Sequence, residues 1–449
     1  MRSRTGLVAA LACLFAFSLL SSAAFAQSGV EVARNETTVQ FPQSITFRLV
    51  VDAASPIVDA ELRYRIPQLS CGTSVATGLP AVAPGRQQDI EWTMDLRQAG
   101  GLPVGARTVY WWALTTADGQ TVETPERTLV FEDPRFSWRA IEGHGVTLRW
   151  HAGSEAFARG LLETAEDALR RLEAAAGVRP SRHVDVRVYE SADAMRGALV
   201  FSQEWTGGVA FPAFGLVTIG IGEHDLEWGA RAMTHELAHL VMGDAAFFCG
   251  SHIPTWLNEG IAVHAEGELS SGFASRLAAA ITADEVYGVR SLAGGFPANP
   301  DDALLAYAQS YSFVDFLLER HGGPERMSQL MAAFRASGSI EAALRETYGF
   351  DQHGLDAGWR RHVGLRPRPT PTPSDTDRPV PTLVPFWATP SPVGPAATPT
   401  RPAATPTPTS GAGGGLGCNA GGGATSGGVD AVALCVVLGG AAALLRRRV

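Results

Sequence analysis

The sequence contains no lysine: its 36 lysine-plus-arginine positions are all arginine. We interpret this absence as a coding bias that says nothing about function. Acidic residues number 45, the formal net charge is −9, and the chain has no basic stripe. Proteins that neutralise nucleic-acid phosphates need such a stripe, so the composition argues against a nucleic-acid partner.

Cysteine is also scarce, with five residues in a chain of 449. Their spacings resemble no zinc-binding cysteine pattern, which argues against a cysteine-ligated metal site. Cys71 and Cys249 could pair in an oxidising compartment and so link two domains. Two buried free thiols are the alternative, and we slightly favour this alternative from the sequence.

Long apolar runs are confined to the two ends of the chain. A basic start precedes the apolar run 6–20, and the small-x-small sequence Ala24-Phe25-Ala26 follows it. This order predicts a secretory signal peptide over residues 1–26. The alternative is a membrane anchor, for which the run is short. We therefore expect an exported protein.

The C-terminal fifth of the chain has the composition of a tail. Pro-Thr repeats and a Gly-rich stretch predict a solvated linker over residues 365–428. The segment 429–449 contains the apolar run 431–445 and ends in three arginines, which would stay cytoplasmic. It resembles bacterial C-terminal sorting signals but lacks a Leu-Pro-x-Thr-Gly motif. We expect an apolar transmembrane or sorting helix that anchors the protein at the extracellular face of the membrane.

Residues 27–133 have the pattern of an all-β domain. Short β-rich runs alternate with Gly, Pro and Asp clusters, and about seven strands in this length predict an immunoglobulin- or fibronectin-like sandwich. The expected strands are 45–51, 58–66, 90–96, 108–115 and 128–131.

Residues 134–364 predict an α+β domain. Strands expected at 146–150, 184–189 and 215–221 alternate with helices that begin at Ser154 and Ser191, which describes a mixed sheet. The rest of the domain is expected to be helical, over 225–243, 254–267, 273–284, 301–320 and 324–361.

A metal-binding motif lies on the first of these later helices. Residues 235–239 read His-Glu-Leu-Ala-His, and positions i and i+4 of a helix lie on one face. His235 and His239 can therefore bind one ion, while Glu236 can act as general base without ligating it. A catalytic zinc needs a third protein ligand and one open position, where it lowers the pKa of water towards about 7.

The third ligand is indicated by the segment Trp-Leu-Asn-Glu-Gly at 256–260. Together with the first motif, it resembles the gluzincin metallopeptidases, which include thermolysin and aminopeptidase N. The resemblance covers residues 140–362 and implies that Glu259, on the next helix, is the third zinc ligand. His264 points off the ligand face, and Glu266 lies two turns or about 10 Å further along, so neither replaces it.

The same resemblance implies further site residues. In the aminopeptidase-like gluzincins a tyrosine in a similar place opens a helix and donates its hydroxyl to the oxyanion, and the resemblance implies this role for Tyr307. Packing in the core of an amphipathic helix is the alternative for Tyr307 and Tyr311. The segment Gly208-Val209-Ala210 lies where gluzincins place an edge strand that pairs with extended peptides, although an ordinary sheet edge is equally compatible.

These features predict a zinc peptidase with one Zn²⁺ per chain, acting on a peptide or protein. The Gly-x-Met-Glu-Asn segment that binds the free amine in aminopeptidases is absent, which weakens the case for exopeptidase action and favours an endopeptidase. The alternative function is a non-catalytic surface adhesion protein with a vestigial metallopeptidase fold. Intact Glu236 favours the enzyme, because a binding module has no use for a base beside the metal.

Overall fold

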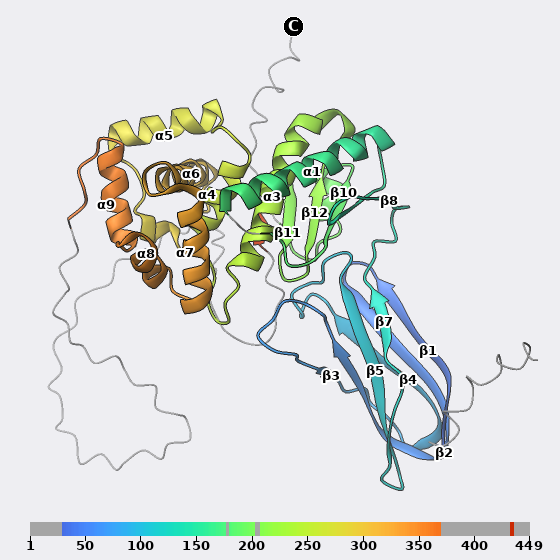
Figure 1. The fold of residues 1–449 in the computed structure, drawn as a ribbon. Helices are drawn as coiled ribbons and strands as arrows, with labels where there is room; N and C mark the ends of the chain where they lie inside the picture. The colour runs from blue at the N-terminus through green and yellow to red at the C-terminus, as the bar shows by residue number, and fades with distance from the viewer. Residues whose placement is uncertain (1–28, 177–178, 203–206, 370–431, 435–449) are drawn as a thin grey trace, which may run out of the picture. The chain divides into compact units, whose positions relative to one another are not determined.

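The structure is a computed structural model that describes residues 29–176, 179–202, 207–369 and 432–434 (Figure 1). All of these up to Arg368, and the strand at 432–434, belong to one compact unit. The signal peptide expected at 1–26, nearly all of the linker 365–428 and most of the segment 429–449 lie outside the described residues, and they stay predictions.

The N-terminal region is an antiparallel β-sheet whose longest strand organises the others. Its strands are β1 (Val30–Gln40), β2 (Ser44–Arg65), β3 (Ala76–Gly78), β4 (Gly85–Asp95), β5 (Arg107–Thr116), β6 (Thr121–Glu123) and β7 (Arg127–Val130). The two strands expected at 45–51 and 58–66 are one strand, β2. Its first half pairs with β1 and β4, and its second half with β3 and β5.

Buried and partly exposed residues alternate along β2, which shows that one face of this sheet packs on a core. Ile45, Phe47, Leu49 and Val51 occupy every second position of β2 and are all buried, as a strand with one face on a core requires. The expected antiparallel β region is thereby confirmed. Its classification as an immunoglobulin- or fibronectin-like sandwich stays a prediction.

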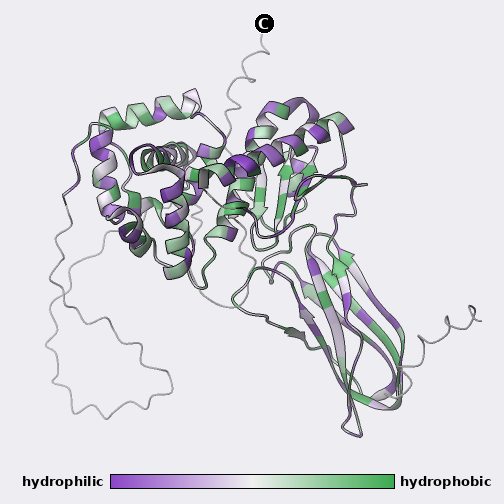
Figure 2. Ribbon diagram, viewed as in Figure 1, coloured by the Kyte–Doolittle hydropathy of each residue, from purple (hydrophilic) through white to green (hydrophobic). Residues whose placement is uncertain are grey.

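The second region contains a mixed sheet of six strands in the order β13-β11-β12-β10-β9-β8. Strands β9, β10 and β12 are parallel to one another, and the outer strands are antiparallel to their neighbours. Figure 2 shows its central strands mostly in the hydrophobic colour, as expected for a sheet buried on both faces. The strands are β8 (Arg139–Glu142), β9 (Val146–Trp150), β10 (Val184–Tyr189), β11 (Gly208–Phe211), β12 (Leu216–Gly220) and β13 (Val432–Leu434).

Two helices cover one face of this sheet. The helices α1 (Glu155–Ala176) and α3 (Leu226–Ala245) pack on the sheet and on each other, and a short helix, α2 (Ala192–Arg196), follows β10. Ser154 and Ser191 accept hydrogen bonds from backbone amides in the first turns of α1 and α2, which confirms both expected helix starts. The predicted alternation of strands and helices is therefore correct.

The rest of the domain is helical, as expected, but its last part is divided. The predicted helix 324–361 is three helices, because Gly338 and Gly349 adopt left-handed conformations with φ of 64° and 79°. Such residues end helices by satisfying the last carbonyl groups. The helices are α4 (Thr255–Ala265), α5 (Ser271–Ala283), α6 (Pro300–Arg320), α7 (Gly323–Ser337), α8 (Ile340–Tyr348) and α9 (Gln352–His362).

The two regions share a hydrophobic core and a covalent link. Val209, Phe211 and Leu216 of the mixed sheet pack in the same cluster as the buried residues of β2. Cys71 and Cys249 form a disulfide with their Cα atoms 5.5 Å apart, at exposed positions. The preference for buried free thiols was therefore wrong: the pairing depends on a contact between segments 178 residues apart in sequence.

The expected C-terminal apolar helix is described at three residues only. Val432–Leu434 form strand β13 and pair with the outer edge of β11. Within the described ranges, no helix combines the length and apolar character needed to cross a membrane.

Candidate metal centre

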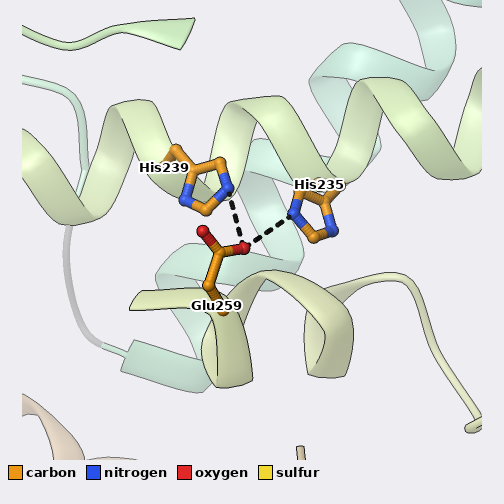
Figure 3. A group of neighbouring side chains, drawn as sticks. All are labelled: His235, His239 and Glu259. Atoms are coloured by element: carbon orange, nitrogen blue, oxygen red, sulfur yellow. Dashed lines mark ion pairs between the residues drawn. The ribbon is translucent and has the colours of Figure 1, made fainter. Parts of the chain in front are cut away.

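Helix α3 presents the two histidines of the motif side by side. His235 and His239 lie one turn apart on one face, with ring centroids 4.8 Å apart, and both are buried (Figure 3). The helix begins shortly after β12, and from Ala232 to its end nearly all of its residues are buried, between the sheet and α4. The local i, i+4 spacing thus fixes two of the expected ligands on one rigid element.

Glu259 approaches both histidines from α4. Its Oε2 lies 3.4 Å from Nε2 of His235 and 3.4 Å from Nε2 of His239. Ligand atoms about 2.0–2.2 Å from a tetrahedral zinc ion lie roughly 3.3–3.5 Å from one another. Among the described residues, His235, His239 and Glu259 form a group that could hold a metal ion. Their ligand atoms all lie within 4.8 Å of one another.

The polar atoms at this point are buried and unpaired. Within the described ranges, Nε2 of His235, both ring nitrogens of His239 and Oε2 of Glu259 have no hydrogen-bond partner. Burying such atoms without a partner costs roughly 1–3 kcal/mol each. A cation at their meeting point would satisfy them together, and two imidazoles with one carboxylate are a donor set that suits zinc.

Burial and charge shift the pKa values around the site. Burial raises the pKa of Glu236 to about 7. Burial also tends to raise the pKa of Glu259, but the two neighbouring histidines outweigh it and hold this pKa at about 2. For His235 burial acts to lower the pKa, and the nearby carboxylates of Glu259 and Glu266 outweigh it and raise the pKa to about 10. The carboxylates thus make a site that favours positive charge.

Glu236 lies against the edge strand β11. A Cβ atom added to Gly208 would come within 2.6 Å of Oε1 of Glu236, so only glycine leaves room for this carboxylate. Gly208 and Ala210 face α3, whereas Val209 and Phe211 face the shared core. The outer edge of β11 is paired with β13, so an external peptide at this edge would take the place of β13.

Glu266, which was not expected to bind the metal directly, holds the proposed ligand His235 in place. Oε1 of Glu266, at the end of α4, lies 2.7 Å from Nδ1 of His235, and its Oε2 lies 3.3 Å from Nη2 of Arg231. A carboxylate on the second ring nitrogen fixes the tautomer and directs Nε2 at the metal position. The signal was available: Glu266 lies seven residues after Glu259, on the same helix face.

Replacing Glu266 by alanine should lower zinc affinity by about 10- to 100-fold, the usual effect of removing such a supporting group. The three ligands stay in place, so binding should weaken and not vanish. Competition with a chelator of known affinity measures the change. Glu266→Gln keeps an acceptor for His235 and should recover part of the loss; equal zinc affinity in all three proteins would contradict this role.

The tyrosines and the remaining histidine lie beside α4. Tyr307 is buried in α6 against Val263, with its ring edge on Phe296. Tyr311 stacks on His264, which also lies 3.7 Å from Asp315. His264 is thus engaged away from the three ligands, as expected, and the role of Tyr307 stays a prediction.

Comparison with known families identifies the region around this site. Residues 164–364 match the Peptidase MA superfamily. This range contains His235, Glu236, His239 and Glu259, and all but its last two residues lie inside the range of the expected resemblance, 140–362. None of the curated proteins compared matches the chain.

Among solved structures the similarity is distant. An aminopeptidase N family protein from Idiomarina loihiensis matches at 10% identity over 73% of this chain and 75% of the other, with a TM-score of 0.36. OgpA from Akkermansia muciniphila, solved with an O-glycopeptide, matches at 10% identity over 23% of this chain, with a TM-score of 0.19. The match spans 28% of the OgpA chain. A carbohydrate-binding module of family 56 matches at 12% identity over 21% of this chain and 95% of its own, with a TM-score of 0.15.

Proposed function

Because residues 164–364 are a Peptidase MA superfamily domain, we propose that this protein is a zinc-dependent endopeptidase, exported and held at the cell surface. The chain carries a metallopeptidase domain with an intact His-His-Glu site. In the proposal His235, His239 and Glu259 hold one zinc ion. Glu236 is the general base, and Tyr307 donates a hydrogen bond to the oxyanion.

One observation carries the proposal: three buried ligand atoms converge, and Glu236 is the fourth polar group beside them. Both oxygens of Glu236 are buried and lack a hydrogen-bond partner within the described ranges, as expected of a base whose partner is the zinc-bound water. Zinc, when bound, polarises a carbonyl group and makes a water nucleophilic at neutral pH. Glu236 accepts the proton of that water and can deliver it to the leaving amine.

The edge strand β11 supports peptides as the substrate class. Its backbone runs beside Glu236, and main-chain hydrogen bonds to such an edge hold an extended segment independently of its sequence. Gly208, Val209 and Ala210 are the residues that would pair with the substrate. An extended segment within a chain, and not only a chain end, can bind in this way, which favours endopeptidase action.

The disulfide supports export. Disulfides such as Cys71–Cys249 persist in oxidising compartments and are rare in the cytosol, which agrees with the signal peptide proposed at 1–26. The apolar segment 429–449 is the proposed anchor.

Zinc content and proteolysis of an unfolded protein test the proposal together. We expect one zinc per chain, cleavage of a protein such as reduced casein, loss of cleavage on chelation and recovery on adding zinc. A protein that binds zinc and cleaves nothing would instead favour the non-catalytic surface protein.

Tyr307→Phe should lower turnover by about 10²–10³-fold with little change in substrate affinity, because an oxyanion donor acts only in the transition state. Phenylalanine keeps the ring and its contact with Phe296, so zinc content and melting temperature should be preserved. Steady-state kinetics on one peptide measure the effect. Tyr311→Phe is the control. If Tyr311→Phe loses turnover and Tyr307→Phe does not, then Tyr311 is the oxyanion donor and Tyr307 is a packing residue.

A chain that ends after Arg368 should fold and stay at least as active as the full chain. Nη1 of Arg368 lies 2.7 Å from Oδ1 of Asp356, and Nη2 donates to the carbonyl of Val286, so the domain needs this residue. A chain that ends at Leu365 is the control and should melt at a lower temperature. Inactivity of the longer chain with zinc still bound would show that the tail contributes to catalysis.

A further inference from the structure

A cleft of about 560 Å³ lies directly beside the metal centre. His239 and Glu259 line it, so it is continuous with the position of the zinc ion. Pro212 and Ala213, which follow β11, form part of its wall. A substrate that pairs with β11 therefore has access to this cleft.

The cleft is closed by parts of the chain that are far apart in sequence. One wall is the segment 68–71 of the N-terminal β region, and the facing wall is the loop 246–253 between α3 and α4. The disulfide Cys71–Cys249 joins the two walls, and the amide of Leu69 donates a hydrogen bond to the carbonyl of Ala213 at 2.7 Å. The wall at 68–71 therefore comes from outside the metallopeptidase domain, residues 164–364.

The lining of the cleft is largely apolar. Leu69, Phe247, Phe248 and Ile253 are half-buried and line it, and none carries a charge. Removing an apolar side chain from water is favourable in proportion to the area buried, so such a cleft discriminates between substrates by side-chain size. The chemistry of the walls therefore fits a bulky aliphatic or aromatic side chain.

The direction of β11 determines which side of the substrate enters the cleft. Strand β13 shows how a partner pairs: it is antiparallel, with Val432 opposite Ala210 and Leu434 opposite Gly208. A substrate in this orientation runs its N-terminal part past Ala210 towards Pro212 and Ala213. Glu236 lies at Gly208, which places the scissile bond there. The residues before the scissile bond thus reach the cleft.

A polar group in the cleft is ready for the peptide backbone. Asn258 is 8% exposed, lines the cleft next to Glu259, and its Oδ1 lacks a hydrogen-bond partner in the described part of the chain. A buried acceptor of this kind is expected to bind a donor. A backbone amide of the substrate, on the same side of the scissile bond, supplies one.

We propose that this cleft is the specificity pocket of the enzyme and selects a bulky apolar residue on the N-terminal side of the scissile bond. Leu69 and the disulfide Cys71–Cys249 make the N-terminal β region a part of substrate recognition. The inference rests on the proposed peptidase function and adds its specificity.

Cleavage of a peptide library, read by mass spectrometry, tests the specificity. We expect Leu, Ile, Met or Phe to be enriched at one of the positions that precede the cleaved bond, by about tenfold or more over Ala. Zinc-dependent cleavage without such enrichment, or with enrichment only after the bond, would overturn this inference and leave the proposed function standing. No zinc-dependent cleavage at all would overturn both.

Substitution of Leu69 tests the role of the β region. Leu69→Asp places a charge in the apolar wall and should reduce the kcat/KM ratio of a leucine substrate over its alanine analogue by about tenfold or more. Leu79→Asp is the matched control, since Leu79 belongs to the same region, is 71% exposed and lies outside the cleft; its ratio should equal that of the parent. An unchanged ratio in Leu69→Asp would overturn the assignment.

The disulfide gives a second, independent measurement. Cys71→Ser combined with Cys249→Ser removes the link between the walls and should raise KM for the leucine substrate more than it lowers kcat. Zinc content and melting temperature, measured on the same protein, separate this effect from unfolding. Because both cysteines are exposed, reduction of the parent protein should have the same effect. Parental KM in a folded double variant would show that the link has no role in recognition.

Discussion

Glu236→Gln should strongly lower peptidase activity while the protein keeps its zinc. The side chain lies beside the three ligands without an ion pair to either histidine, and both of its oxygens are unpaired within the described ranges. Glutamine has nearly the same shape but cannot accept the proton of the attacking water. General-base catalysis contributes about 10²–10⁴-fold, so turnover should fall by about that factor.

Metal stoichiometry and turnover must be measured on the same sample of Glu236→Gln. Glu227→Gln is the matched control, because Glu227 is an exposed glutamate on the same helix. The control should have the activity and zinc content of the parent. Loss of zinc from Glu236→Gln would mean that Glu236 is a ligand, and retained turnover would mean that another group accepts the proton.

Glu259→Ala should weaken zinc binding by more than the ~100-fold that removal of a supporting residue can cause. Its Oε2 is the atom that approaches both histidines, and two imidazoles alone leave a poor site. A metal that binds only the folded state also raises stability. The increase in melting temperature that zinc gives the parent should therefore be absent in Glu259→Ala, together with activity.

Glu268→Ala, just beyond α4 and exposed, is the control for this change. It should bind zinc as the parent does. If Glu259→Ala binds zinc tightly while Glu266→Ala does not, then Glu266 is the third ligand and the gluzincin assignment is wrong. The 2.7 Å contact between Glu266 and the outer nitrogen of His235 predicts the opposite result.

The location of the metal centre could be predicted from sequence because its main determinants are local. The i, i+4 spacing of His235 and His239 places both on one helix face whatever surrounds the helix. Glu259 was found by a resemblance in the segment that follows. The helix starts at Ser154 and Ser191 were also predictable, since a serine side chain caps its own helix.

The ends of the last helices were harder to predict. The helical pattern continues across Gly338 and Gly349, and one long helix 324–361 was expected. The breaks follow from the left-handed conformation of both glycines and from the packing of α7 against α8. The spacing of apolar residues predicts neither of these features. The two strands expected in place of β2 failed in a similar way, because β2 continues through the residues that separate them.

The sequence by itself determined the side chains of the candidate metal centre: two histidines at helical spacing, the proposed base Glu236 beside the first of them, a carboxylate on the next helix, and the order of strands and helices that carries them. Only the tertiary structure decided how these side chains are supported and directed. It placed Glu266 on His235, paired Cys71 with Cys249, and brought Leu69 to the wall of the cleft. The physical reason is the distance along the chain over which each interaction acts: helix periodicity and capping involve residues only a few positions apart. A cleft whose two walls are joined by a disulfide between residues 178 positions apart exists only when the whole core has formed.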